Sequence, residues 1–233
     1  MAVTVSNSAY GNSSFGGSSL TISSYSHGGG PLVVVATHRR PGSNSVTGIT
    51  ANGTSMTSMG SHIVEGSAAT WVYYLNDIAS FTANVVISYS DSEVYYGGAH
   101  VLSFSGATST PFSGFTGNNG SDTGPTVTIS SASGDLVVAT LINIDTSTTH
   151  TIGSGQTLVR DDAGTNGTDQ AIKHRLVTTT EGGAASVVMN GTLSASEIWT
   201  AVGFSVAASG GGGSNVPLEV LIPKQFGFFP GRA

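Results

Sequence analysis

The sequence predicts an all-β protein whose antiparallel strands pack as a β-sandwich. Three observations support this prediction. Short apolar bursts bounded by Gly, Ser, Asn or Pro recur about every 8–12 residues, which is typical of sandwiches and barrels. No segment of useful length repeats its apolar residues with the roughly 3.6-residue period of a helix. Only 9% of the 233 residues are charged and 33 are glycine, a composition that favours many strands joined by tight turns.

The expected strands number about fourteen. Some alternate apolar and polar residues, as in SLTISSYS at 19–26, and others are continuously apolar, as in PLVVVATH at 31–38. We expect the polar, Gly-rich stretch 110–124 to be a linker or a surface loop. In chain order, the expected strands span residues 2–5, 19–26, 31–38, 46–50, 54–60, 69–75, 81–90, 98–105, 125–131, 135–144, 156–160, 170–177, 185–193 and 197–209.

Asn-Gly-Thr triplets stand at residues 52–54, 166–168 and 190–192. Asn-Gly accepts the positive φ that tight hairpin turns require, so we expect turns at these places. The same triplets are glycosylation sequons. We favour the turn interpretation because the N-terminus has neither the basic nor the apolar part of a secretion signal.

The chain repeats itself weakly, with a period of about a hundred residues. Three pairs of segments match in the same order: 20–37 with 127–140, 82–90 with 184–192, and 101–109 with 201–209. Two tandem sandwiches would explain the repeat, and so would one sandwich with pseudo-twofold halves, as in a double Greek-key jelly roll. We prefer a single domain over residues 19–209, preceded by an N-terminal arm or edge strand at 1–18.

Composition excludes several classes of function. The net charge is −6, and the seven Lys and Arg residues form no cluster, which argues against nucleic-acid binding. There is no cysteine, and therefore neither a disulfide nor a thiolate metal site. No apolar run approaches the roughly 18 residues of a membrane helix. We expect a protein made in the cytoplasm that stays soluble or leaves the cell by lysis.

The order of several segments resembles a known family. VTGITANGTSMTSMG, TWVYYLND, GGAHVLSFSGATSTPF, PTVTISSASGDLVVAT and WTAVGFSVAAS are similar to jelly-roll modules found in tailed-phage structural proteins and in bacterial secreted proteins. The resemblance covers most of residues 19–208 and concerns strand and turn patterns. It implies a jelly-roll-like sandwich used for display, adhesion or virion architecture, and it brings no catalytic residues with it.

A search for catalytic and metal-binding patterns yields weak candidates only. Asp122 begins an Asp-Thr-Gly triplet like that of aspartic proteases, but it lies in a polar stretch and not after an apolar strand. Asp161, Asp162 and Asp169 surround a Gly/Asn turn and could hold Ca²⁺, although a solvated hairpin tip is the simpler interpretation. The six histidines, His27, His38, His62, His100, His150 and His174, do not pair at metal-ligand spacing. We expect no catalytic residue, no metal and no cofactor.

Aromatic residues gather in WVYY and EVYYGG, which contain Trp71, Tyr73, Tyr74, Tyr95 and Tyr96. Exposed rings of this kind can stack on sugars, so a glycan is a possible ligand. Alternate strand residues face opposite sides, which places Trp71 with Tyr73 and leaves Tyr74 on the other face. We favour a role in the sandwich core.

The C-terminal segment differs from the rest of the chain. Four glycines make residues 210–214 a flexible linker, and 215–233 is an apolar tail in which two prolines bracket LEVLI. Such a segment can add to the edge of another sheet, and each Phe ring can bury about 150–250 Å². Docking on a partner is preferred over folding back on the sandwich or disorder. The expected partner-binding residues are Leu218, Val220, Ile222, Phe226, Phe228, Phe229 and Arg232.

The sequence therefore favours a non-enzymatic virion structural protein, most specifically a capsid decoration (cement) protein located on the virion. Its expected partners are further copies of itself and the major capsid protein or another virion protein. Alternatives are a phage tail or fibre protein that contacts the host surface, and a carbohydrate-binding module.

Overall fold

The computed structural model describes residues 1–13, 17–39, 45–90, 96–166 and 169–210. These residues form antiparallel β-strands, which confirms the all-β prediction. Among them, no helix has the length and apolarity needed to cross a membrane. The seven expected tail-anchor residues, and nearly all of the linker and tail, lie outside the described residues.

The first half of the chain forms two sheets. The first inner sheet has the order β1-β10-β3-β8-β6, with β7 also paired to β8. The first outer sheet has the order β2-β9-β4-β5. The strand bounds are β1 Thr4–Ser13, β2 Ser19–His27, β3 Gly30–Arg39, β4 Val46–Ala51, β5 Thr54–Ser55, β6 Thr57–Ser58, β7 Ile63–Glu65, β8 Ala68–Ile78, β9 Phe81–Tyr89 and β10 Tyr96–Ser105.

The second half repeats this arrangement. The second inner sheet has the order β11-β18-β13-β16-β15, and the second outer sheet the order β12-β17-β14. The strand bounds are β11 Ala107–Asp122, β12 Thr126–Ile129, β13 Leu136–Asn143, β14 His150–Ile152, β15 Thr157–Asn166, β16 Asp169–Gly182, β17 Val187–Leu193 and β18 Glu197–Ala208.

The strand pairs within each half are nested. In the first half β1 pairs with β10, β2 with β9, β3 with β8, and β4 with β5. In the second half β11 pairs with β18, β12 with β17, and β13 with β16. The segments that match in the sequence occupy equivalent positions, since β2–β3 corresponds to β12–β13 and β10 to β18. The sequence repeat is therefore a structural repeat.

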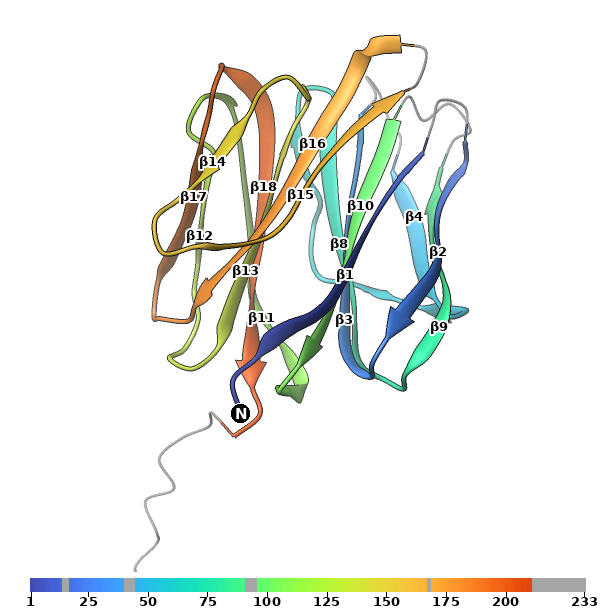
Figure 1. The fold of residues 1–233 in the computed structure, drawn as a ribbon, viewed down its shortest axis with the longest axis vertical. Helices are drawn as coiled ribbons and strands as arrows, with labels where there is room; N and C mark the ends of the chain where they lie inside the picture. Colours follow the sequence, from blue (N-terminus) through green and yellow to red (C-terminus); the bar gives the residue numbers. More distant parts are fainter. Residues whose placement is uncertain (14–16, 40–44, 91–95, 167–168, 211–233) are drawn as a thin grey trace, which may run out of the picture.

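The four sheets stack as four layers, with the two inner sheets face to face (Figure 1). Each half has its own apolar core between its inner and outer sheets. A third core lies between the inner sheets and joins the halves, with Leu102 and Phe104 from one side and Val202 and Phe204 from the other. Each half thus has its own pair of sheets, as in tandem sandwiches, while the shared core makes the halves one packed body.

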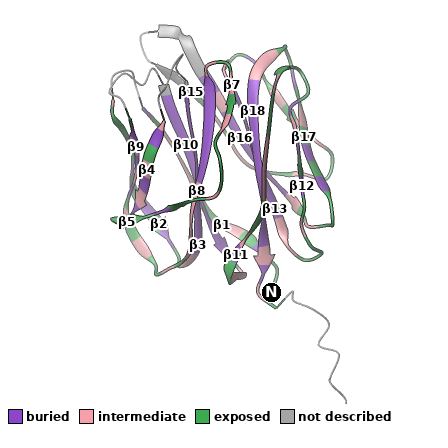
Figure 2. Cartoon of the chain, turned by 180° about the vertical axis from the view of Figure 1, so that it is seen from behind, coloured by how far each residue is buried: buried purple, intermediate pink, exposed green. Residues whose placement is uncertain are grey.

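Burial follows this layering (Figure 2). Strand β13 is buried at every position after its first, because both faces of the inner sheet are covered. In contrast, β2 and β17 largely alternate between buried and exposed residues, since one face of each outer sheet meets solvent. Continuous apolar runs thus form inner strands, and alternating runs form outer strands.

Two expectations about loops are wrong. Residues 110–124 were expected to be a linker or loop, yet most of them belong to β11, which pairs with β18 through two register shifts. Glycine serves close packing there, because a Cβ at Gly117 would overlap Ile63. The Asn-Gly pair at 52–53 does form a turn with positive φ at both residues. The triplet at 190–192 instead lies inside β17, where a Cβ at Gly191 would overlap the His150 ring.

Candidate functional site

Trp71, which was considered both for glycan stacking and for the sandwich core, is a core residue. It is buried in the first outer core, and its ring lies between His38, at a centroid distance of 4.7 Å, and His62, at 5.1 Å. Tyr73 packs on the same core, whereas Tyr74 packs on the shared inner core. The predicted division of faces and the preference for a core role are confirmed for these residues. Tyr95 and the side chain of Tyr96 lie outside the described part of the chain.

Asp122 is engaged in local structure. Its Oδ1 accepts hydrogen bonds from the backbone N–H of Gly124 at 2.7 Å and from the indole N–H of Trp199 at 3.0 Å. The carboxylate therefore closes a turn and binds the indole of a buried tryptophan near the start of β18.

The carboxylates considered for a Ca²⁺ site, as the alternative to a solvated hairpin tip, do not lie together. Asp161 forms a bidentate ion pair with Arg175, and Asp162 forms another with Arg160. The Asp169 side chain lies outside the described set. In the described part of the chain, no group of three or more His, Asp or Glu side chains is placed to hold a metal ion. Alternation along β15 explains the separation, because neighbouring residues of a strand point to opposite faces.

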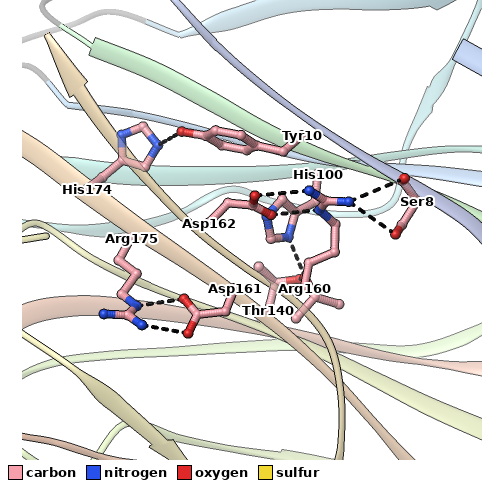
Figure 3. Close-up of polar contacts among 10 residues, drawn as sticks. Ser8, Tyr10, His100, Thr140, Arg160, Asp161, Asp162, His174 and Arg175 are labelled. Carbon is pink, nitrogen blue, oxygen red and sulfur yellow. Dashed lines mark hydrogen bonds and ion pairs between the residues drawn. The ribbon is translucent and has the colours of Figure 1, made fainter. Parts of the chain in front are cut away.

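A buried polar cluster instead lies at one end of the contact between the inner sheets (Figure 3). We call it the interface polar cluster. Both halves contribute to it, the first through β1 and β10 and the second through β13, β15 and β16. Its members are Tyr10, His100, Thr140, Arg160, Asp162, His174 and Thr178.

A chain of polar contacts runs through the cluster and crosses between the halves. The Thr140 and Thr178 hydroxyl oxygens lie 2.8 Å apart, and Thr178 Oγ1 lies 2.7 Å from His100 Nδ1. On the other side of the ring, His100 Nε2 lies 3.2 Å from Asp162 Oδ2. Either neutral tautomer of His100 keeps the contact between Nδ1 and Thr178, because a hydroxyl can donate or accept a hydrogen bond.

Arg160 extends the contacts to the first strand. Its Nε and Nη2 donate to the two oxygens of Asp162 at 2.7 and 2.9 Å. Its Nη1 reaches the backbone carbonyl of Ser8 at 3.4 Å (Figure 3). The guanidinium therefore connects edge strand β15 of one half to edge strand β1 of the other.

Tyr10 and His174 form the other side of the cluster. The Tyr10 hydroxyl lies 3.2 Å from His174 Nε2, and its ring meets the rings of His100 and His174 edge-on at 5.8 and 6.3 Å. Gly98 makes room for this contact, because a Cβ at that position would overlap the His174 ring. The small residue is thus needed where the two inner sheets approach each other.

The surroundings shift the pKa values of the ionisable members. Burial lowers the pKa of His100, although Asp162 opposes the shift. Burial, with a smaller contribution from His100, lowers the pKa of His174 to about 3. Burial would raise the pKa of Asp162, but hydrogen bonds from His100 and Arg160 outweigh it and lower the pKa to about 2. At neutral pH the cluster therefore holds two neutral histidines and one Asp–Arg ion pair.

The order hydroxyl, imidazole and carboxylate in Thr178, His100 and Asp162 is the order found in hydrolase triads. Thr178 and His100 are, however, completely buried between the inner sheets, where Thr178 contacts protein groups on both sides. Directional contacts between buried polar groups specify a relative position more narrowly than apolar packing does. The geometry thus suits a structural role, in which these contacts fix the position of one half relative to the other.

Sequence reasoning missed this cluster because its members are far apart in the chain. His100 and Thr178 are separated by 78 positions, and Tyr10 and His174 by 164. One local signal was available: polar residues interrupt otherwise apolar inner strands, as His100 does in GAHVLSFS and Thr140 in DLVVATLINI. A polar residue inside a doubly covered strand indicates a buried partner.

Comparison with known proteins identifies no relative, because no family model, no curated protein and no solved structure matches the chain.

Proposed function

We propose that the chain is a non-enzymatic virion structural protein, and most specifically a capsid decoration (cement) protein. In this proposal the two packed halves form a rigid body on the shell surface, and the C-terminal tail contributes the anchor. The tail lies outside the described residues, so its role rests on its sequence. The protein would be made in the host cytoplasm and assemble onto the virion there.

We further propose that each half is a jelly roll. Support comes from the nested strand pairs, in which β1 pairs with β10, β2 with β9 and β3 with β8. Successive strands alternate between two facing sheets, as expected when one long hairpin is wound around a barrel axis. The second half has the same order. Jelly rolls serve many functions, including capsid and lectin roles, so this feature supports the class of protein only by analogy.

The observation that carries the proposal is the position of the described chain ends. The Met1 amine donates to the Ser209 carbonyl at 2.9 Å, so both ends meet at one pole of the four-layer body (Figure 1). Everything after Gly210 therefore leaves from that pole. A tail that begins at one pole can hold this end on a surface while the rest of the body projects outward.

The tail has the chemistry of an anchor. Phe226, Phe228 and Phe229 can each bury about 150–250 Å² in apolar pockets, which corresponds to a few kcal/mol per ring at about 25 cal/mol/Å². Arg232 can pair with a carboxylate of the partner. A shell offers many copies of the same pocket. When the body also forms oligomers, several weak anchors act together and the avidity exceeds the affinity of any single tail.

The proposal is tested with shells of the phage whose genome encodes the chain, prepared from particles in which this gene is deleted. Full-length protein and the triple variant Phe226→Ser/Phe228→Ser/Phe229→Ser are added, and occupancy is measured after sedimentation. We expect stoichiometric binding of the full-length protein and at least a tenfold loss for the variant. Equal occupancy of the two proteins would contradict a tail anchor, and absence of the full-length protein from the shells would contradict the decoration role.

A further inference from the structure

A cleft of about 520 Å³ opens between the two halves, beside the interface polar cluster. One wall is Val3 together with the first part of β1, as far as Ser8, and the other is the start of β15, from Thr157 to Val159. Leu136 and Thr180 complete the lining. The lining residue Ser8 also accepts the contact from Arg160, so the cleft adjoins the interface polar cluster at this residue. The volume lies in the range of about 300–1,000 Å³ that is common for ligand sites.

Both walls of the cleft are edge strands. Within the described sheets β1 pairs with β10 on one side only, and β15 pairs with β16 on one side only. Each wall strand also has a register shift in its pairing with the neighbouring strand, between Val5 and Asn7 where β1 pairs with β10 and between Leu158 and Arg160 where β15 pairs with β16. Edge strands offer backbone groups to an added extended segment, and irregular strand geometry shortens the stretch over which that segment can pair.

The cleft lining has no charged side chain and mixes apolar with hydroxyl groups. Val3, Val5, Leu136, Leu158 and Val159 supply the apolar part. Leu158 is 48% exposed and is one of the few large apolar side chains that are exposed in the described part of the chain. A matching ligand is a short extended peptide with small to medium apolar side chains on one side.

The chain itself contains such a segment close by. The last described residues lie at the Val3 end of the cleft, where the Met1 amine binds the Ser209 carbonyl at 2.9 Å. Eight residue-to-residue steps separate Gly210 from Leu218, enough to span about 26 Å when extended. Pro217 and Pro223 bracket the five residues LEVLI, whose alternation places Leu218, Val220 and Ile222 on one side.

We propose that the cleft between β1 and β15 binds the Leu218–Ile222 segment of its own chain. The bracketing prolines lack N–H groups and cannot donate to a strand pairing, which favours a short paired stretch between them. A short linker that starts beside the site gives an effective concentration in the millimolar range, which favours the chain's own segment over that of another copy. Phe226, Phe228 and Phe229 follow the docked segment and are left for an external partner.

Disulfide trapping in the full-length protein tests the proposal, and the absence of native cysteine gives a clean background. Leu158→Cys is combined in turn with Leu218→Cys, Val220→Cys and Ile222→Cys. The matched control combines the same tail positions with Val188→Cys, an apolar strand residue that is 52% exposed in the second outer sheet and outside the cleft lining. Each protein is oxidised at micromolar concentration with copper phenanthroline, and cross-links are resolved on denaturing gels.

We expect at least one Leu158→Cys pair to form an intramolecular cross-link at least tenfold faster than the corresponding Val188→Cys pair. Equal rates for cleft and control pairs would overturn the proposal, because a tail without a preferred site reaches both positions by collision. Cross-linked dimers in place of intramolecular products would also overturn it, since they would place another copy's segment in the cleft.

Limited trypsin digestion provides a second readout that needs no cysteine. Lys224 lies two residues after the proposed docked segment, so docking should slow cleavage there. We expect Leu158→Asp to accelerate cleavage after Lys224 at least fivefold, while the matched Val188→Asp leaves the rate unchanged. An unchanged rate in Leu158→Asp contradicts the docking. Both experiments use the isolated chain, so their outcome is independent of whether the protein binds a shell.

Discussion

The contact between the two inner sheets is apolar at one end and polar at the other, although the same strands run through both ends. On β10, Leu102 and Phe104 face the second half at the apolar end, and His100 faces it at the polar end. On β18, Val202 and Phe204 belong to the apolar end, whereas the Thr200 hydroxyl meets that of Thr70 at 2.8 Å.

The two ends have different roles. The apolar end stabilises the association of the two halves, and the polar end specifies their relative position. At the apolar end, Phe104, Phe112 and Phe204 meet edge-on with centroid distances of 5.9–6.5 Å. Such packing contributes most of the free energy of association but tolerates small shifts. At the polar end, each hydrogen bond requires one partner at one distance. The polar end therefore determines which relative position of the halves is adopted.

The largest expected effect comes from emptying the apolar end. Phe104 is fully buried between the inner sheets, so Phe104→Ala leaves a cavity shared by both halves. We expect the free energy of unfolding to fall by about 3–5 kcal/mol, measured by urea denaturation. The exposed control Val188→Ala should change it by less than about 0.5 kcal/mol. A loss below about 1 kcal/mol for Phe104→Ala would show that the inner core contributes little.

Acidification should weaken the polar end. The pKa of His174 is lowered from 6.5 to about 3 by burial, so below pH 6.5 the unfolded chain binds a proton that the folded chain does not. Stability is therefore complete above pH 6.5 and declines as the pH falls towards 3. At pH 5 this histidine alone accounts for a loss of about 2 kcal/mol. His100, whose pKa is also lowered, adds to the loss.

The pH effect is measured by urea denaturation at pH 7, 6 and 5. His174→Gln has no titrating ring, so its stability should decline less steeply over this range than that of the unmodified protein. Asp162 adds little over this range, because its contribution to stability is lost mainly between its unfolded-state pKa of 3.8 and its folded-state pKa of about 2. Identical slopes for the two proteins would mean that His174 is not held neutral at the contact.

Removing one hydroxyl from the polar chain should have a smaller effect. Thr178→Val keeps the shape of the side chain but leaves His100 Nδ1 and the Thr140 hydroxyl without their shared partner. We expect a loss of about 1–2 kcal/mol in the free energy of unfolding. Thr128→Val, on an exposed face of β12, is the matched control and should be nearly neutral. An unchanged free energy of unfolding in Thr178→Val would contradict the role of this hydroxyl in fixing the relative position of the halves.

The smallest effect is expected at the surface ion pair. Arg175 and Asp161 form a bidentate pair at 2.6 Å, with side chains 19% and 25% exposed. Arg175→Gln should lower the free energy of unfolding by about 0.2–1 kcal/mol at low salt. The difference should shrink in about 1 M NaCl, because salt screens charges near the surface. An undiminished difference at high salt would indicate a packing role for Arg175.

Much of the fold was predictable because it depends on local patterns. The alternating SLTISSYS became outer strand β2, and the continuously apolar PLVVVATH became inner strand β3. The repeat predicted two related halves, which the strand orders confirm. Residues 110–124 were misread because glycine occurs both in loops and where strands must approach closely. In the structure, the close approach of Ile63 to Gly117 shows that glycine serves strand packing here and not a loop.

The candidate sites were less predictable. Asp161 and Asp162 are adjacent in sequence, which suggested a shared ion, yet their strand directs them to opposite faces and to different arginines. The pairing of His100 with Thr178 and Asp162 depends on which sheets face each other. No local pattern contains this information, because contacts across 78 positions follow from the packing of whole sheets.

The sequence by itself determined most of the strands other than β11, their antiparallel tendency, the twofold repetition and the chemical character of a tail with apolar and aromatic residues. These features follow from alternation, turn residues and composition, which act over a few residues at a time. The tertiary structure alone decided that four layers form, that the inner sheets share a core, and that a buried polar cluster and an open cleft lie side by side between the halves. The physical reason is that burial and hydrogen bonding between layers depend on residues brought together only when both halves have folded.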